Sequence, residues 1–124
     1  MGPFMVFAGP CDEATAAAVR RGLRGLQATL AARSRLVEDL ELAATELVTN
    51  AVRAGAHRIE VELQIVSTQL ELRISDDGPG VPAAKQPSLD RVDGRGLHIV
   101  AALADDWGYT LNVVSKTVWA RFVG

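Results

Sequence analysis

The stretch Ile74-Ser75-Asp76-Asp77-Gly78-Pro79-Gly80 decides how the rest of this chain is arranged. It follows an apolar run in which Leu70, Leu72 and Ile74 share one face, because side chains alternate between the two faces of a strand. The next residue on that face is Asp76, so a carboxylate stands in line with core residues. Burying a charge is costly unless something binds it, and the two glycines let a backbone or a ligand come close. The sequence therefore predicts that this stretch forms one wall of a small-molecule pocket.

Length and composition indicate one globular domain spanning residues 1–124. The chain is 48% hydrophobic and 23% charged, and its net charge of −2 argues against direct nucleic-acid binding, which needs a basic excess. The single cysteine, Cys11, excludes an internal disulfide and a cysteine-based metal cluster, and fits a reducing cytosol. Apolar runs stay well short of the ~18 residues of a membrane span. Residues 4–8 lack a preceding basic residue and make a poor signal peptide. We therefore expect a cytoplasmic protein without a membrane partner.

Two segments beside the opening stretch have clear periodicity. Arg58 to Val66 alternates between apolar and polar residues and predicts a half-buried strand, whose hairpin mate is Gln69 to Ser75. A helix is expected from Ser34 to about Ala54, ending at Gly55. The other expected elements are a strand at 4–7 stopped by Gly9-Pro10, a helix capped by Asp12, a loop at 81–93, a helix from Gly94 to about Ala104, and strands at 107–114 and 117–123 joined at Ser115-Lys116. Strands paired as hairpins with helices between them imply an α+β fold: a two-layer sandwich with helices on one face of a mixed, mainly antiparallel sheet.

Polar residues gather on one side of the helix expected at 34–54. Glu46, Asn50 and Arg53 stand at i, i+4 and i+7 and point the same way. Taken alone, such a group indicates a solvated helix face. Asp76 could likewise cap a turn, although its position on the core face makes Asp77 the better turn residue.

The first predicted helix raises two further questions. Gly22 and Gly25 weaken it by roughly 1 kcal/mol each relative to alanine, and indicate close packing against a strand or a second subunit. Several arginines lie along this region and indicate either a solvated face or a docking surface for an acidic partner. They are Arg20, Arg21, Arg24, Arg33 and Arg35.

If the ligand is a nucleotide, each feature has a separate task. Asp76 accepts a hydrogen bond from the exocyclic amino group of adenine, while Gly78 and Gly80 let the base lie against the backbone. Gly94-Arg95-Gly96 opens a helix whose free N–H groups face phosphates. The helix dipole contributes only about 0.3–2 kcal/mol, so a triphosphate also needs a metal, and Asn50 supplies an oxygen suited to Mg²⁺. Lys85, Arg91 and Arg95 are either phosphate contacts or solubilising residues.

These segments together resemble a known family. Glu46-Leu47-Val48-Thr49-Asn50-Ala51 resembles the N box of the GHKL (Bergerat-fold) ATPases, and Asp76-Asp77-Gly78-Pro79-Gly80 resembles their D-x-G-x-G box. Gly94-Arg95-Gly96-Leu97-His98-Ile99-Val100 resembles their second glycine box. The end of the chain, with Lys116-Thr117-Val118-Trp119-Ala120, is similar to the actinobacterial anti-sigma factor serine/threonine-protein kinases. The P-loop and dinucleotide-binding glycine motifs are absent from the sequence.

The resemblance implies a role for each matching residue. Glu46 would be the general base that takes a proton from a serine of a partner protein, Asn50 would coordinate Mg²⁺, and Asp76 would bind adenine. The remaining residues implied to line the ATP site are Arg53, Gly78, Gly80, Val81, Gly94, Arg95, Gly96, Leu97 and Thr117. The implied partners are a sigma factor and an anti-anti-sigma protein of the STAS type, and the resembling branch forms homodimers.

Three functions remain open on the sequence. The first is an ATP-dependent serine/threonine kinase that also sequesters a sigma factor. The second is a non-catalytic ATP-binding module that regulates by protein contact alone. The third is a detached catalytic domain of a histidine kinase, which the lack of a preceding helical hairpin with a phosphoacceptor argues against.

Overall fold

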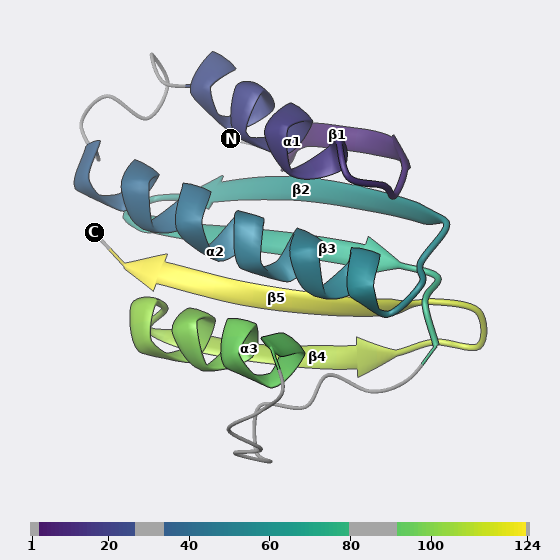
Figure 1. Ribbon diagram of the computed structural model, residues 1–124. Helices are drawn as coiled ribbons and strands as arrows, with labels where there is room; N and C mark the ends of the chain where they lie inside the picture. The colour runs from purple at the N-terminus through teal and green to yellow at the C-terminus, as the bar shows by residue number, and fades with distance from the viewer. Residues whose placement is uncertain (1–2, 27–33, 80–91, 124) are drawn as a thin grey trace.

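The computed structural model describes residues 3–26, 34–79 and 92–123, and places their helices on one side of a single sheet. The helices are α1 (Thr15–Gly25), α2 (Ser34–Arg53) and α3 (Val92–Leu103), and the strands are β1 (Pro3–Pro10), β2 (Arg58–Val66), β3 (Gln69–Asp76), β4 (Asp106–Leu111) and β5 (Lys116–Val123). The strand order is β1-β2-β3-β5-β4, and every neighbouring pair is antiparallel. The predicted two-layer α+β sandwich is confirmed (Figure 1), and the sheet, expected to be mixed but mainly antiparallel, is antiparallel throughout the described strands.

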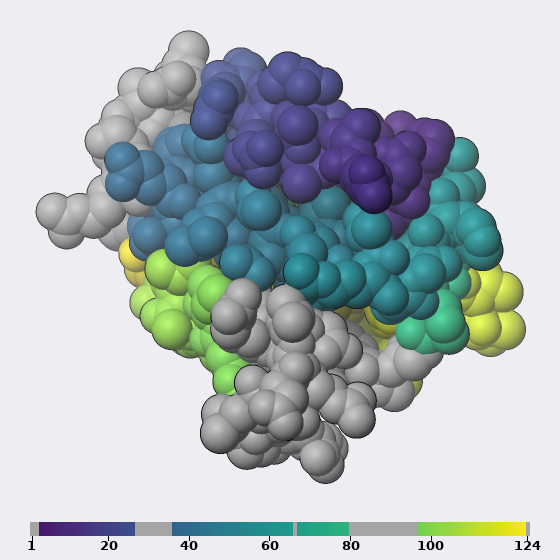
Figure 2. Space-filling view, in the orientation of Figure 1, coloured from purple at the N-terminus to yellow at the C-terminus, as the bar shows by residue number. Residues whose placement is uncertain are grey.

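The core lies between this sheet and the helices. Ile59, Val61 and Leu63 of β2 are buried, and each faces a β3 residue across the hairpin. Helix α2 turns its apolar side to the same layer, and full burial of one such side chain contributes about 1.5–3 kcal/mol. In the space-filling view, the helices hide most of the sheet from this side (Figure 2). The alternation and the helical periodicity of the sequence therefore meet in one core.

Helix α2 ends where the sequence predicts. Gly55 adopts a φ of 84°, a conformation that glycine accepts without steric cost. Its N–H donates to the carbonyl of Val52 over 3.1 Å, and the N–H of Ala56 donates to the carbonyl of Ala51, also over 3.1 Å. These two bonds close the helix and turn the chain into β2.

Strand packing explains one of the two glycines of α1. A Cβ on Gly22 would lie 2.6 Å from the carbonyl oxygen of Val6 in β1, whereas a Cβ on Gly25 would meet nothing within 4 Å. Of the two predicted causes for this close approach, the strand is therefore the one observed. Strand β1 continues through Pro10, beyond the predicted stop, and proline is tolerated there because β1 is an edge strand.

Two arginines of α1 contact side chains of α2. Arg24 forms an ion pair of 3.2 Å with Glu41, and Arg20 donates a hydrogen bond of 3.4 Å to Thr45. Arg33 and the side chain of Arg35 lie outside the described residues. The Arg24 side chain is 63% exposed, so this pair adds little stability.

Three predicted boundaries are wrong by one to three residues. Strand β4 ends at Leu111, and the turn that follows is closed by the N–H of Asn112 donating to the carbonyl of Ser115 over 2.8 Å. Lys116 is therefore the first residue of β5 and does not belong to the turn. The β-branched pair Val113-Val114 suggested a longer strand, but both residues are exposed in the turn. Helix α3 begins at Val92, two residues before the predicted start.

Candidate functional site

The predicted site residues converge at one end of the molecule. The C-terminal end of α2, the end of β3 and the β4–β5 hairpin lie together there (Figure 1). Helices α2 and α3 pack side by side and run in opposite directions, so the start of α3 faces back toward this end. The fold thus brings the three sequence motifs to one region.

Asp76 is a buried carboxylate at the last position of β3. Its relative exposure is 5%, and the register pairs it with Ile59 on one side and Lys116 on the other. This position on the core face is the one that strand parity predicts. Its Oδ1 accepts the N–H of Gly78 over 2.7 Å and lies 3.6 Å from the Lys116 ammonium group.

The environment of Asp76 favours its neutral form more than water does. Burial raises the pKa of the Asp76 carboxyl above its ordinary value, and the nearby Asp77 adds to this. The Gly78 N–H and the Lys116 ammonium group act in the opposite direction without cancelling the effect of burial. The carboxylate is therefore incompletely compensated, and a ligand that donates a hydrogen bond to it relieves part of that cost.

Asp77 has the structural task that the sequence assigns to it. Its Oδ1 accepts the backbone N–H groups of His57, over 2.7 Å, and Arg58, over 3.1 Å. These bonds, led by the one from Arg58, lower the pKa of Asp77 below its ordinary value. Asp77 therefore joins the β3 turn to the start of β2, which leaves Asp76 as the carboxylate available to a ligand.

Gly78 leaves no room for a side chain. A Cβ at this position would lie 2.9 Å from Asp76 Oδ1 and 3.2 Å from the Cβ of Ala56. Glycine is required because the turn backbone lies directly against the carboxylate that it hydrogen-bonds. The second glycine of this box, Gly80, and the following Val81 lie outside the described residues, as do Lys85 and Arg91.

Helix α2 brings an unusual oxygen to the site. Glu46 and Asn50 are both half-buried, one helical turn apart on the same face, while Arg53 at the helix end is exposed. Among the described side chains, Asn50 Oδ1 is the one buried oxygen or nitrogen without a hydrogen-bond partner. A buried acceptor left unpaired costs about 1–3 kcal/mol. That cost indicates that Asn50 is retained for something that binds its oxygen.

Mg²⁺ fits this oxygen. The ion accepts neutral amide oxygens and commonly takes only one or two protein ligands, with phosphates and waters completing its octahedron. Within the described ranges, no three His, Cys, Asp or Glu side chains come together as a metal cluster. The metal would therefore depend on Asn50 and on the phosphates of the nucleotide.

The second glycine segment lies inside the start of α3. Gly94 falls in the first turn, whose N–H groups have no partner within the helix, and Gly96 lies further along. The side chain of Arg95 is outside the described residues. Leu97 is 4% exposed and belongs to the core, so its side chain holds the helix in place.

The structure separates Thr117 from the predicted site. Its hydroxyl lies 2.8 Å from that of Ser75, on the face of the sheet without helices. The preceding residue, Lys116, is the one that faces Asp76. Sequence analysis missed Lys116 because it placed this residue in a turn. The same parity count that identified Asp76, run backward through Phe122, Ala120 and Val118, would have found it.

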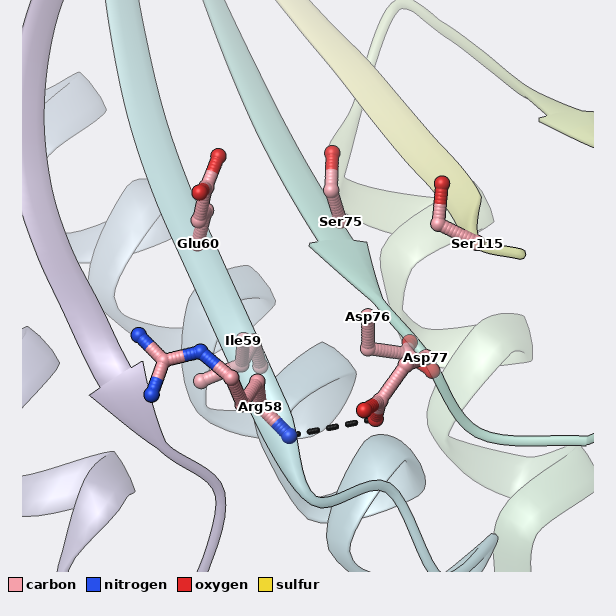
Figure 3. Close-up of a pocket in the computed structure, with 7 residues that line it drawn as sticks. All are labelled: Arg58, Ile59, Glu60, Ser75, Asp76, Asp77 and Ser115. Carbon is pink, nitrogen blue, oxygen red and sulfur yellow. Dashed lines mark hydrogen bonds between the residues drawn. The ribbon is translucent and has the colours of Figure 1, made fainter. Parts of the chain in front are cut away.

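A small hollow of about 190 Å³ adjoins the end of β3 on the other face of the sheet. The side chains of Glu60, Ser75 and Ser115 line it and point away from the Asp76 carboxylate (Figure 3). Asp76 and Asp77 also line the hollow, but the Asp76 side chain lies on the opposite, helix-covered face of the sheet, the face on which α2 carries Asn50. We therefore do not assign the nucleotide to this hollow.

The structure defines an α+β domain with its helices on one face of an antiparallel sheet, and comparisons with known proteins identify its family. Residues 10–122 match the family model of the histidine kinase-like ATPase domain, and the chain belongs to this family. It is also similar to proteins named serine-protein kinase RsbW. Those from Listeria innocua serovar 6a and Listeria monocytogenes serotype 4b are each 27% identical over 104 residues. The match covers 70% of this chain and 66% of each relative's length.

Solved structures share the fold. The crystal structure of the RsbU and RsbW domains of Rv1364c from Mycobacterium tuberculosis matches with a TM-score of 0.75 and 19% identity, over 99% of this chain and 32% of that chain. The histidine kinase AdeS of Acinetobacter baumannii matches with a TM-score of 0.54 and 18% identity, over 70% of this chain and 46% of that chain. None of the described helices is long and apolar enough to cross a membrane.

Proposed function

We propose that this protein binds ATP with Mg²⁺ and transfers the terminal phosphoryl group to a serine or threonine of a partner protein. The observation that carries the proposal is the unpaired, buried Asn50 Oδ1, one helical turn from the Glu46 carboxylate. A metal ligand and a carboxylate on one helix face suit phosphoryl transfer, which depends on positioning and charge neutralisation. The similarity to proteins named serine-protein kinase RsbW supports the same reaction class.

Each residue has one task in this scheme. Asp76 binds the adenine amino group, and Gly78 allows the base to approach the turn. Asn50 holds Mg²⁺, which neutralises charge on the phosphates. Gly94, with Gly96 beyond it, directs the start of α3 toward the phosphates. In this proposal the pocket is completed by Gly80, Val81 and the Arg95 side chain. Leu97 holds α3 in place from the core, and Arg53 lies at the exposed end of α2 beside the pocket.

The phosphoryl transfer takes place in one step. Glu46 accepts the proton of the partner's hydroxyl, and the oxygen attacks the γ-phosphorus in line. The bond between that phosphorus and the β–γ bridging oxygen breaks, and ADP carries away its electron pair. Glu46 must be ionised to act, and its half-buried position leaves it accessible to an incoming hydroxyl.

We further infer the biological setting from the resemblance to the anti-sigma factor kinases. The partner that receives phosphate is an anti-anti-sigma protein of the STAS type, and this chain also sequesters a sigma factor in the cytoplasm. A homodimer is the expected assembly. The chain spans about two-thirds of the length of the curated Listeria relatives it matches, so these partners are proposals for this chain.

The test uses γ-labelled ATP, Mg²⁺ and each purified STAS-type protein from the same genome. Wild-type protein should label a serine or threonine of one of them. Glu46→Gln should keep ATP affinity within about 3-fold while transfer falls by at least about 10²-fold, the usual contribution of a general base. Glu38→Gln, an exposed residue two turns earlier on α2, is the control and should transfer normally.

Two results would contradict the proposal in different ways. Loss of ATP binding in Glu46→Gln would remove Glu46 from the role of base. Tight ATP binding by the wild type without label on any STAS-type protein would favour the non-catalytic ATP-binding module instead.

A further inference from the structure

The strongest unassigned feature of the molecule is the side chain of Lys116. It is the first residue of β5 and lies opposite Asp76 in the register, on the face covered by helices. Its side chain is 10% exposed. Lysine is almost never buried without partners, because its ammonium group is strongly hydrated and its stem loses rotamer freedom. A buried lysine beside the proposed base-binding carboxylate therefore needs an explanation.

The ammonium group is matched to three acceptors. Lys116 Nζ donates to the carbonyl of Gly78 over 3.3 Å and to the carbonyl of Pro79 over 3.2 Å, and lies 3.6 Å from Asp76 Oδ1. An ammonium group has three N–H donors and no acceptor; two of them are used by the carbonyls, and the carboxylate is held as an ion pair. The contacts join the start of β5 to the end of β3 and to the turn that follows it.

These contacts also give the two oxygens of the Asp76 carboxylate different roles. Both partners that the described residues supply to the carboxylate, the Gly78 N–H and Lys116, use Oδ1. A base that donates an N–H group would then meet Oδ2. Because Gly78 lies tight against Oδ1, and Lys116 holds the carbonyl of the same residue, the carboxylate cannot turn without moving the strand and the turn together.

We propose that Lys116 is a positioning residue for base recognition: its ammonium group fixes the Asp76 carboxyl group and the Gly78–Pro79 backbone as one rigid edge of the nucleotide pocket. The inference rests on the proposed ATP site and adds a residue to it. Lys116 does not itself contact the reacting phosphate, and acts on the ligand through Asp76.

The charge of Lys116 makes the proposal testable by pH. The titratable groups that face Asp76 from the described elements are Lys116 from β5, Asp77 from its own turn, and Cys11 from the segment after β1. Burial, with the neighbouring carboxylates, raises the pKa of the Cys11 thiol, so this group stays neutral near pH 7. Among the described residues, Lys116 is therefore the cation that opposes protonation of Asp76 as the pH falls.

The experiment measures ATP affinity by calorimetry from pH 5 to 8 in wild type, Lys116→Met, Lys116→Arg and Arg73→Met. The ratio of each variant to wild type cancels the titration of ATP itself. In Lys116→Met, the acidic fall in affinity should move up by about 1–3 pH units, the usual effect of one adjacent charge on a carboxyl group. On the acidic side of that fall, affinity relative to wild type should decrease about tenfold for each pH unit by which the profile has moved.

The two other variants separate charge from packing. Lys116→Arg keeps the cation and should follow the wild-type pH profile. Arg73→Met removes a cation that pairs with Glu71 on the opposite face of β3, and should leave ATP binding unchanged at every pH. A profile for Lys116→Met that equals wild type would overturn this inference alone. A loss that is uniform in pH and is not restored by arginine would overturn it too, because it would assign only packing to Lys116.

A wild-type measurement covers the case in which Lys116→Met does not fold. Lys85 and Lys116 are the two lysines of the sequence, so ¹⁵N-lysine labelling gives two side-chain signals. The chemical shift of the Lys116 side chain should change over the same pH range in which ATP affinity falls. A chemical shift that stays constant over this range overturns the proposal. Failure of the wild type to bind ATP at pH 7 would instead remove the proposed function itself, and this inference with it.

Discussion

Replacing Asp76 with asparagine should stabilise the nucleotide-free protein while weakening its hold on ATP. Burial raises the folded-state pKa of Asp76 above its unfolded value. The stability that such a group contributes is complete below the unfolded pKa and is lost as the pH rises through the folded pKa. At pH 7 the ionised carboxylate therefore costs stability, and a neutral amide of the same shape removes that cost. Lys116 retains the Gly78 and Pro79 carbonyls as acceptors, so it is not left without partners.

The ATP half of this prediction has a defined size. One buried hydrogen bond to the base is lost when the carboxylate becomes an amide that presents N–H to N–H. That loss is worth about 1–3 kcal/mol, or about 5- to 150-fold in affinity. Thermal unfolding without nucleotide, at pH 7 and at pH 4, and calorimetry with ATP measure the two halves separately. The gain in melting temperature should shrink at the lower pH, where the wild-type carboxyl is increasingly protonated.

The adjacent aspartate supplies a matched control of opposite sign. Backbone hydrogen bonds from Arg58 and His57 lower the pKa of Asp77, so its contribution is present above the unfolded pKa and is lost as the pH falls through the folded one. Asp77→Asn should therefore lower the melting temperature at pH 7 and leave ATP affinity nearly unchanged. The reasoning is refuted if Asp76→Asn melts below wild type at pH 7, or if its ATP affinity is unaltered.

Three further predictions test other parts of the structure. Asn50→Ala should abolish Mg²⁺-dependent ATP binding with little loss of stability, because Oδ1 has no partner to lose; a large drop in melting temperature would contradict this. Gly22→Ala should destabilise by about 1–3 kcal/mol through overpacking against β1, whereas Gly25→Ala should stabilise by up to about 1 kcal/mol; chemical denaturation that shows equal effects would reject the packing argument. Glu71→Gln should lower the melting temperature at pH 7, and its difference from wild type should vanish in acid. Burial opposes ionisation of Glu71, but hydrogen bonds from two arginines outweigh it and lower its pKa; a difference that persists at low pH would exclude this cause.

Periodicity in the sequence predicts much of the fold and, within the candidate site, the positions of Asp76, Glu46 and Asn50. Strand parity identified Asp76 as the inward carboxylate, and the structure buries it where predicted. Parity failed for Lys116 because the turn was placed too late: the β-branched Val113-Val114 extended the expected strand, although Asn112 and Ser115 close the turn around them. The helical spacing of Glu46 and Asn50 was visible, but the unpaired state of Asn50 Oδ1 was not, since it depends on which neighbours tertiary packing supplies.

The two faces of the sheet show what distinguishes a binding site from a structural ion pair. On the outer face, buried Glu71 is hydrogen-bonded by two arginines, one of which, Arg121, also stacks over the Trp119 ring at 4.5 Å. Its charge is fully compensated, so its pKa falls despite burial. On the covered face, the described residues supply Asp76 with one cation, Lys116, and burial raises the pKa of Asp76. The same strands therefore carry one satisfied carboxylate and one that is not, and only the second gains from a ligand that donates a hydrogen bond. Among the described residues Asn50 Oδ1 repeats this pattern as an acceptor without a donor, which is why we propose a nucleotide with its metal ion as the ligand that binds at both positions.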